Sequence, residues 1–437
     1  MFTHVAAANL AHACKRIKSL KKIAIIGSGI AGLSCAHLLH KKYDITVFEK
    51  NNYIGGHTAT IDIQVDGVKH AIDTGFIVFN DRTYPYFEKL LKRIGVERQP
   101  TEMSFSVHNQ QTGFEYNGHT FASLFAQKRN IFRPRFWKLL SDIVRFNTLC
   151  KKLYHDNDYQ SEQMLGQLLD QHGFNDFFRY HYILPMGAAI WSTSIKEMSN
   201  VGVEFFVKFF FNHGLLDITN RPQWYVIPGG SREYINPLIS GFKDKIKLNT
   251  DIQSIFRSPE QVLIRLKNGT VEQFDKVIFA CHSDQALALL ENPSTDEKAI
   301  LSAIPYTENS VILHTDTALL PKRKAAWASW NYLLTDNLDK AAVVTYQMNI
   351  LQGITSKTQF CVTLNHREGI DKTKILREFT YHHPVFNKTS IAAQQQKQLI
   401  DGANNSYFCG AYWYNGFHED GVKSAVDVAR KLGVEFE

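Results

Sequence analysis

The first strongly patterned segment of the chain is an apolar run, IAIIGSGIAGLSC, at residues 23–35. Residues 22–26 are almost all apolar, which predicts a strand buried on both faces of a parallel sheet. A glycine turn and a helix of small and apolar residues follow. The segment YDITVFEK, residues 43–50, predicts a second strand that ends beside an acidic residue. The pattern therefore indicates a βαβ unit and an α/β fold.

Hydrophobic periodicity predicts further elements along the chain. Residues 82–96, RTYPYFEKLLKRIGV, place apolar residues at helical spacing and end at a glycine, which predicts a helix. Residues 311–316 and 359–365 predict strands of a mixed sheet. Near the C-terminus, YFCG at 407–410 predicts a short buried strand, and residues 419–432 predict a helix.

The turn after the first strand has the G-x-G-x-x-G spacing of a dinucleotide-binding loop. Gly27 permits a tight turn, Gly29 lets the backbone approach a pyrophosphate, and Gly32 lets helix and strand pack closely. Ile30 and Ala31 begin the helix, whose free N–H groups and dipole favour a phosphate.

An acidic residue follows the turn at the expected distance. Glu49 lies 22 residues after Gly27 and precedes Lys50, and an acid here hydrogen-bonds a ribose hydroxyl. A carboxylate at this position disfavours a 2′-phosphate, so NADP is not expected. The alternative is an ordinary βα turn without a ligand. It is disfavoured because strand, glycines, helix, second strand and acid are all in place.

Length and composition place the chain among globular proteins of two or more domains. It has 437 residues, 44% hydrophobic and 21% charged, with a net charge of +7 and 30 phenylalanines. The six cysteines lack metal or disulfide spacing, which predicts a reducing, cytoplasmic setting and no metal site. No apolar run reaches the roughly 18 residues of a membrane span. Residues 1–19 are expected to be a leader of uncertain structure.

Two segments beyond the acid, EKNNYIGGHTAT (49–60) and HAIDTGFIVFN (70–80), resemble the flavin-containing amine oxidase superfamily. The resemblance implies FAD as the cofactor and an α/β fold. That fold pairs a Rossmann-like FAD-binding domain of the amine oxidase/glutathione reductase type with a discontinuous α+β substrate domain. Residues implied to line the FAD are Gly55, Gly56, Asp73 and Gly75. His57 is either a neighbour of the flavin or a cap of its loop, and the first interpretation is preferred.

The segment SYFCGAYWYNGFHEDGVKSAVDVARKL, residues 406–432, resembles the strand, loop and helix that pass the flavin in that superfamily. The helix N-terminus is implied to point at the cofactor, where backbone donors and the helix dipole meet anionic oxygen. Ala411 stands where an acid commonly binds the ribityl chain, and is a departure from the family pattern. The further residues implied to lie at the cofactor are Gly410, Glu419, Asp420, Gly421 and, through its backbone on the adenine side, Ile252.

The resemblance implies that both domains are discontinuous along the chain. The FAD-binding domain is expected to comprise residues 20–80, 222–300 and 400–437. The substrate-binding domain is expected to comprise residues 81–221 and 301–399.

Two departures from the family argue against simple amine oxidation. The position of the lysine that amine oxidases bridge to the flavin falls on Leu313, and one aromatic guide position falls on Phe417, which lacks a hydroxyl. Four segments resemble a branch associated with cyclopropane-fatty-acid synthases: IGGHTAT, DTGFIVFNDRTYPYFEKLLKRIGV, PMGAAIWS and GFHEDGVKSA. That branch implies hydride removal from an unsaturated or modified fatty acyl chain of a phospholipid, and a cyclopropane-synthase-like methyltransferase as partner. The alternatives are an amine or polyamine oxidase, and a non-catalytic FAD-holding accessory to a lipid methyltransferase.

Three residues are candidates for a catalytic role. His418 precedes the acidic pair and could act as an acid or base, although a lone histidine is more often structural. Phe417 lies at the aromatic position that faces the flavin. Trp191, beside the small residues of ILPMGAAIWSTS, suits either a wall over the flavin ring or a tight helix contact.

A basic segment at residues 127–152, QKRNIFRPRFWKLLSDIVRFNTLCKK, interleaves eight Lys and Arg with aromatic residues and holds one acid. This composition suits either a membrane surface or a solvated face over a core stripe. The first interpretation predicts a peripheral protein on the inner membrane face. Nucleic acid is not expected as a partner, because no binding module accompanies the charge.

A second aromatic segment, VGVEFFVKFFFNHGLL at residues 201–216, is nearly all apolar. It is expected to pack the substrate domain. The alternative is the lining of a tunnel for a long apolar chain.

Overall fold

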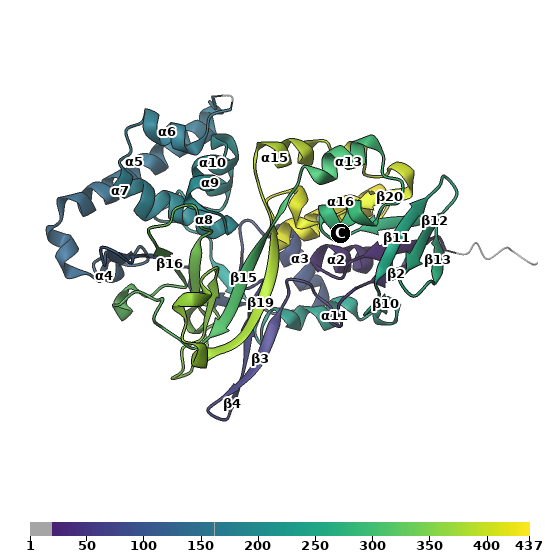
Figure 1. Cartoon of the computed structure of the whole chain (residues 1–437), viewed down its shortest axis with the longest axis horizontal. Coiled ribbons are helices and arrows are strands. Elements are labelled where there is room, and N and C mark those ends of the chain that lie inside the picture. The colour runs from purple at the N-terminus through teal and green to yellow at the C-terminus, as the bar shows by residue number, and fades with distance from the viewer. Residues whose placement is uncertain (1–19, 161) are drawn as a thin grey trace, which may run out of the picture.

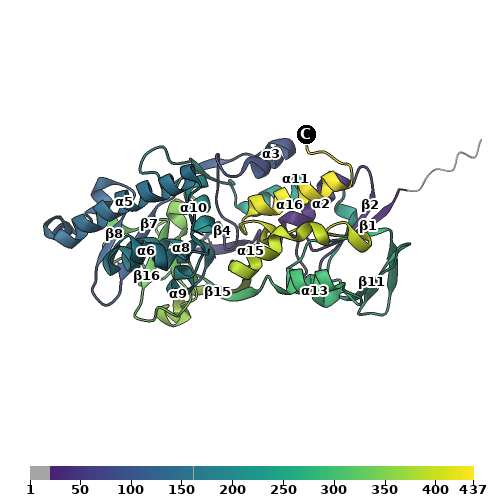
Figure 2. The same ribbon diagram turned by 90° about the horizontal axis from the view of Figure 1, so that it is seen from above.

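The computed structural model describes residues 20–160 and 162–437, and the leader expected at 1–19 lies outside them. Figure 1 shows two lobes. One contains the helices from α4 (Phe121–Leu124) to α10 (Val203–Asn212), and the other contains α2 (Ile30–Leu39) and α16 (His418–Lys431). The long strands β15 (Tyr306–His314) and β19 (Ile375–Pro384) pair antiparallel between the lobes in Figure 1, and β15 has the same place in Figure 2.

The lobe with α2 and α16 is built on a five-stranded parallel sheet of order β10-β2-β1-β14-β20. Its strands are β1 (Lys22–Ile26), β2 (Asp44–Phe48), β10 (Ile246–Lys247), β14 (Lys276–Phe279) and β20 (Ser406–Phe408). The βαβ unit predicted at the start of the chain is β1, α2 and β2, and the predicted α/β fold is confirmed.

Both faces of this sheet are covered, as the continuous apolar pattern of β1 requires. Ile23 and Ile25 pack with the apolar residues of α2 and α16 on one face. Ala24 and Ile26 pack on the other face against a three-stranded antiparallel sheet and α13 (Thr295–Ser302). The strands of that second layer are β11 (Ile252–Arg257), β12 (Val262–Leu266) and β13 (Val271–Phe274).

The other lobe contains a seven-stranded sheet of order β19-β15-β18-β17-β16-β7-β8, as the strands predicted at 311–316 and 359–365 indicated. All neighbours pair antiparallel except β16 and β7. The strands not yet described are β7 (Phe105–Asn109), β8 (Glu115–Asn117), β16 (Trp330–Leu334), β17 (Val343–Gln347) and β18 (Cys361–Leu364).

Helices cover one face of the seven-stranded sheet and form the largely aromatic core of this lobe. They are α5 (Pro134–Asp156), α6 (Leu165–Gln171), α7 (Asp176–Phe178), α8 (Leu184–Trp191), α9 (Ile195–Ser199) and α10. The Phe-rich block 201–216 forms α10, and Phe206, Phe209 and Phe210 are buried in this core.

The remaining elements connect these layers. The hairpin β3 (Thr60–Val65) and β4 (Val68–Asp73) projects at the bottom of Figure 1. A small sheet pairs β5 (Phe79–Asn80), β9 (Trp224–Val226) and β6 (Gln99–Thr101). The predicted helix at 82–96 is α3 (Pro85–Ile94), which ends at Gly95 in a left-handed conformation. The other helices are α11 (Ile235–Ile239), α12 (Ser283–Leu289), α14 (Met348–Leu351) and α15 (Lys388–Gln395). Across the described ranges, none of the helices has the length and apolar character to cross a bilayer.

Candidate functional site

The glycine turn between β1 and α2 leaves room for a ligand. Gly27 has a φ of +107°, and a Cβ there would lie 2.9 Å from the Ala280 carbonyl oxygen. A Cβ at Gly32 would lie 2.0 Å from the Gly27 carbonyl oxygen, so only glycine allows this close packing of α2 on the turn. A Cβ at Gly29, in contrast, would meet no heavy atom within 4 Å. Gly29 therefore faces open space.

Two helix N-termini meet beside Gly29. α2 begins with Ile30 and Ala31 and has no acid in its first turn. Its N-cap residue is Gly29, so no side chain at that position accepts a hydrogen bond from the first N–H groups of the helix. The first turn of α16 packs directly against it, since a Cβ at Gly421 would lie 2.7 Å from Ile30 Cγ2. Helix N-termini carry partial positive charge and free N–H groups. The open space at Gly29 is therefore suited to an anion.

Glu49 lies buried at the carboxyl end of β2 beside this turn. Its Oε2 accepts hydrogen bonds from Ser28 N (3.0 Å) and Ser28 Oγ (2.7 Å), and its Oε1 accepts one from Asn51 N (2.9 Å). The Thr250 N–H donates to the Glu49 carbonyl, which places the segment leading to Ile252 next to the acid. Lys50, the neighbour of Glu49, is exposed. These residues are grouped as expected, and their contacts with a cofactor stay predictions.

The predicted Gly-Gly turn lies against the first glycine turn. The Gly55 N–H donates to the Ser28 carbonyl (3.0 Å), and a Cβ at Gly56 would lie 3.2 Å from Gly29 Cα. A Cβ at Gly75 would lie 2.2 Å from the His57 carbonyl oxygen, so Gly75 permits the two segments to touch. Glycines from three separate stretches of sequence thus surround one space.

Asp73 fastens several segments together around this space. Its carboxylate is fully buried and accepts hydrogen bonds from Thr60 Oγ1 (2.6 Å), Ser231 N (2.9 Å), Ser231 Oγ (3.0 Å) and Gln352 Nε2 (3.1 Å). Burial raises the pKa of Asp73 to about 6, and these donors partly oppose the rise. All of these donors belong to the protein, so Asp73 stabilises the arrangement of the segments that carry them. Its predicted contact with the cofactor stays untested.

His57 presents an unpartnered nitrogen next to the Gly-Gly turn. Its ring centroid lies 5.1 Å from that of Tyr381 and 5.6 Å from that of His383. Burial, and then the charge of His382, lower the pKa of His57 to about 4, so the ring is neutral at pH 7. Its Nε2 is buried and has no hydrogen-bond partner within the described residues. A buried unpaired nitrogen is costly, and a polar group of a bound ligand would satisfy it.

The carboxylates in the first turn of α16 bond to helix N-termini of the protein. Glu419 accepts hydrogen bonds from the backbone N–H groups of Tyr86 (3.0 Å) and Phe87 (2.8 Å) at the start of α3. Asp420 accepts one from Phe417 N (2.9 Å), the cap of its own helix. Burial raises the pKa of each carboxyl to about 7. Their predicted contact with the cofactor stays untested.

Gly410 lies where β20 leads into the loop before α16. Its N–H donates to Ser424 Oγ (2.9 Å), and a Cβ there would lie 2.4 Å from the Tyr412 ring. This bond ties the end of β20 to α16, and the predicted contact of Gly410 with the cofactor stays untested.

His418 is packed into a buried cluster. Its Nε2 lies 3.0 Å from Thr58 Oγ1 and 3.2 Å from Tyr234 OH, and its ring stacks on Phe76 at 3.6 Å. Burial, and then the charge of His57, lower the pKa of His418 well below its ordinary value. General acid–base catalysis is most efficient when the pKa lies near the working pH, and burial moves the pKa of His418 away from it. The geometry therefore favours a packing role over the acid–base role suggested by the sequence.

Phe417 and Trp191 meet through one ring of α10. Phe209 stacks with Phe417 at 5.4 Å and lies 4.6 Å from Trp191 between ring centroids. Phe417 and His418 are neighbours in sequence, but Phe417 faces the helical lobe and His418 faces the glycine turns. Phe417 therefore stands where the two lobes meet.

A cavity of about 390 Å³ lies between α8, α9 and the strands β15 and β19. Trp191, Phe205 and Phe386 give it an aromatic wall, and Asn309 and His383 give it a polar one. Asn309 Nδ2 lies 3.1 Å from His383 Nδ1. Because His383 lines the cavity and also packs on His57, it connects the cavity to the glycine turns.

Sequence reasoning missed most of this cavity. Trp191 was singled out, whereas Asn309, His383 and Phe386 were not. Asn309 and His383 lie in two strands of mixed polar and apolar composition, and the sequence did not reveal that these strands pair.

The comparisons with known proteins agree with this geometry. The family model for flavin containing amine oxidoreductases matches residues 30–354, well over half of the chain. The chain belongs to this family. The assignment confirms the expected superfamily, its Rossmann-like FAD-binding fold and its cofactor FAD; the branch associated with cyclopropane-fatty-acid synthases stays a prediction.

Relatives of this amine oxidoreductase family member include desaturases and oxidases. The chain is 30% identical over 169 residues to a 1-hydroxycarotenoid 3,4-desaturase of Flavobacterium sp. (strain P99-3), covering 34% of this chain and 33% of the desaturase. It is 21% identical over 330 residues to an L-amino-acid oxidase of Siganus canaliculatus, covering 68% of this chain and 57% of that protein. The chain thus spans less than two thirds of the curated relatives it matches.

Solved structures share the fold along almost the whole chain. A fatty acid isomerase from P. acnes that produces CLA has a TM-score of 0.67 at 16% identity, covering 95% of this chain and 99% of that one. Cyclohexylamine oxidase from Brevibacterium oxydans IH-35A has a TM-score of 0.66 at 14% identity, covering 95% and 100%.

The residues of the site fit FAD. The open space at Gly29 and the N-terminus of α2 suit the pyrophosphate, Glu49 suits a ribose, and His57 Nε2 offers an unsatisfied polar atom to the cofactor. When bound, FAD supplies a two-electron acceptor.

The lysine expected of an amine oxidase is not among the residues that line the cavity, all of which lie in the described part of the chain. Leu313 is fully buried in an apolar cluster that includes Ile63 and Ile72, and its neighbour His314 bonds to Thr363.

Proposed function

We propose that this family member is an FAD-dependent oxidoreductase that removes hydride from an unsaturated or modified fatty acyl chain of a phospholipid. The observation that carries the proposal is the cavity beside His383: it has an aromatic wall of Trp191, Phe205 and Phe386 and no lysine. Apolar and aromatic walls bind chains of CH₂ groups by removing them from water.

The polar side of the cavity suits a single functional group on such a chain. Asn309 and His383 are hydrogen-bonded to each other, and burial lowers the pKa of His383 to about 3, so the pair is uncharged at pH 7. An uncharged pair can orient an ester or a double bond without demanding a charged substrate.

The names of the relatives are compatible with this substrate class. Two of the matched curated proteins are carotenoid desaturases, one from Flavobacterium and one from Solanum lycopersicum, and their names denote the desaturation of long apolar chains. A fatty acid isomerase shares the fold. These names support a long apolar substrate.

An amine or polyamine oxidase is the second candidate, and one observation favours it. Glu197 and Asp339 are carboxylates that line the same cavity and could attract an ammonium group. However, Glu197 accepts hydrogen bonds from Thr193 and Ser194, and Asp339 pairs with Lys196 at 3.1 Å. Both carboxylates thus already have partners.

Mass analysis of the lipid tests the proposal. The FAD-loaded protein would be incubated with phospholipids that carry monounsaturated, methyl-branched or cyclopropane chains, and the acyl chains would be recovered. We expect loss of two hydrogens from one class of chain, and we expect Phe205→Glu to abolish it because a carboxylate in the aromatic wall repels the chain.

The matched control is Phe211→Glu, which places the same charge on α10 at a residue that does not line the cavity. Recovery of all chains unchanged in mass, together with turnover of polyamines, would overturn the lipid proposal. Bound FAD without turnover of either class would support the accessory role.

A further inference from the structure

The far end of the helical lobe carries exposed aromatic side chains. Phe132 is 86% exposed and Phe121 is 76% exposed, more than any other large hydrophobic side chain among the described residues. Ile131 and Trp137 are also exposed. These four residues are called the aromatic tip; they lie in α4, in the 3-10 turn Lys128–Phe132 and at the start of α5.

Phe121, Trp137 and Ile131 of the aromatic tip are connected through direct contacts, and Phe132 is the next residue after Ile131. Phe121 packs on Phe125 with 4.9 Å between ring centroids, and Phe125 lies 5.6 Å from Trp137. Trp137 Nε1 donates to the Ile131 carbonyl oxygen at 2.8 Å. Beneath them, Phe125 packs on the fully buried Phe136. The tip is therefore an extension of the core and is held in place from below.

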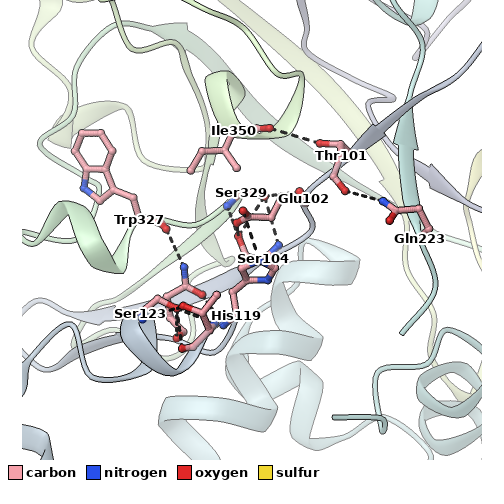
Figure 3. Close-up of polar contacts among 11 residues, drawn as sticks. Thr101, Glu102, Ser104, His119, Ser123, Gln223, Trp327, Ser329 and Ile350 are labelled. Atoms are coloured by element: carbon pink, nitrogen blue, oxygen red, sulfur yellow. Dashed lines mark hydrogen bonds and ion pairs between the residues drawn. The ribbon is translucent and has the colours of Figure 1, made fainter. Parts of the chain in front are cut away.

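Polar contacts tie the segment that precedes α4 to loops that lead into β7 and β16 (Figure 3). Asn117 Nδ2 donates to the Trp327 carbonyl oxygen (2.8 Å), and His119 lies 3.5 Å from the Glu102 carboxylate. Thr120 and Ser123 cap α4 reciprocally. Exposure of the tip is thus built into the fold, because its supporting loop is bonded on several sides.

Positive charge surrounds the tip and has few acidic partners. Residues 120–141 contain no Asp or Glu. Within the described ranges, no ion pair joins an acid to Lys128, Arg129, Arg133 or Arg135, whereas Lys138 pairs with Asp142 at 2.5 Å. Apolar side chains that protrude from an uncompensated basic surface complement an interface with anionic headgroups above and acyl chains below.

We propose that the aromatic tip is a docking surface for an anionic phospholipid bilayer, with Phe121 and Phe132 inserted and the surrounding Lys and Arg on the headgroups. The sequence indicated residues 127–152 for this role. In the structure, only part of this segment can face a membrane, because α5 buries Leu139, Phe146 and Cys150 in the core. The proposed surface also includes α4, which lies outside the segment. The proposal does not depend on the reaction proposed above.

Vesicle sedimentation tests the docking surface. The full-length FAD-loaded protein would be spun with phosphatidylcholine vesicles, with and without phosphatidylglycerol, at low and high salt. We expect binding only to the vesicles that contain phosphatidylglycerol, and weakening with salt. Phe121→Ser with Phe132→Ser is expected to weaken binding at least about tenfold, because the apolar anchors are lost.

The controls separate docking from folding and from general charge. Ile218→Ser removes another strongly exposed apolar side chain (63% exposed) elsewhere and should leave binding unchanged. Arg129→Glu should weaken binding more than Lys298→Glu, which reverses a charge on α13 in the other lobe. FAD content, which should be unchanged, verifies the fold of each variant.

Three results would overturn the proposal. The first is wild-type binding by the double variant, and the second is equal binding to vesicles with and without anionic lipid. The third is tip-dependent self-association in sedimentation velocity without any vesicle binding, because it would assign the tip to a second copy of the chain.

Discussion

At the scale of single residues, the candidate site depends on where a side chain is absent. Gly29 faces open space, whereas Gly32 and Gly75 are pressed against carbonyl oxygens. These three glycines therefore have different roles. Gly29 leaves an open volume, which we propose the cofactor occupies, and Gly32 and Gly75 let the backbone segments around that volume approach each other.

Filling the volume at Gly29 should remove the cofactor without unfolding the protein. We expect Gly29→Val to be purified with little or no FAD, because its side chain occupies the space assigned to the pyrophosphate. The measurement is the flavin absorbance per protein. Gly118→Val is the matched control, because a Cβ there also meets nothing within 4 Å but lies in the other lobe. Normal flavin content in Gly29→Val would show that the cofactor lies elsewhere.

Glu419 should make the stability of the fold depend on pH. Burial raises its pKa to about 7 in the folded protein, above the value of an unfolded glutamate. The stabilisation from the protonated form is complete below about pH 4.5 and is lost as the pH rises through about 7. Glu419→Gln stays neutral, so the free energy of unfolding should fall less between about pH 5 and pH 8 than in the wild type, by a few kcal/mol.

Urea unfolding at the two pH values measures this difference. The pKa of Asp420 is also raised to about 7. Asp420 remains in the variant, so the free energy of unfolding still changes with pH, although less than in the wild type. Glu97→Gln, at an exposed position, should behave as the wild type. An identical slope in Glu419→Gln and the wild type would contradict the assignment of a raised pKa to Glu419.

At the scale of elements, a buried ion pair joins three elements of the lobe that contains α2 and α16. Arg257 on β11 pairs with Glu297 on α13 through two contacts, of 2.5 and 2.9 Å, and also donates to Ser406 on β20 (2.9 Å). Both side chains are only 1% exposed. The pair thus connects the outer layer to the edge of the parallel sheet.

Removing one partner of this pair should lower the free energy of unfolding substantially. Glu297→Ala leaves a buried guanidinium without its counter-charge, so we expect a loss of roughly 3–5 kcal/mol in the free energy of unfolding. Glu204→Ala breaks an exposed pair with Lys208 on α10 and should cost less than about 1 kcal/mol. Denaturant unfolding of the two variants gives the comparison; equal costs would show that the buried pair is not a structural joint.

Local patterns predicted the elements better than the contacts between them. The sequence predicted β1, α2, β2 and α3 because each has its own periodicity and its own stop signal. It did not predict that Glu419 caps α3, or that Asp73 holds Thr60, Ser231 and Gln352, because these partners are up to several hundred residues apart. The cavity was missed for the same reason, since it forms only when β15 and β19 pair beside α8.

At the scale of the whole molecule, the two lobes meet around the proposed reaction site. Phe417, at the start of α16, stacks on Phe209 of the helical lobe, and His57 packs on His383, which lines the cavity. The glycine turns, which we propose hold FAD, and the aromatic cavity, which we propose holds the substrate, are thus connected through His57 and His383. The aromatic tip lies at the far end of the helical lobe (Figure 1).

The central claim is that FAD bound at the glycine turns oxidises a lipid acyl chain. The most direct test is an anaerobic absorbance titration of the FAD-loaded protein, with monounsaturated, methyl-branched and cyclopropane phospholipids in one series and polyamines in another. We predict that one lipid class bleaches the flavin band and that polyamines leave it unchanged. Bleaching by polyamines alone would contradict the lipid substrate, and a protein that cannot be loaded with FAD would contradict the assignment of the site itself.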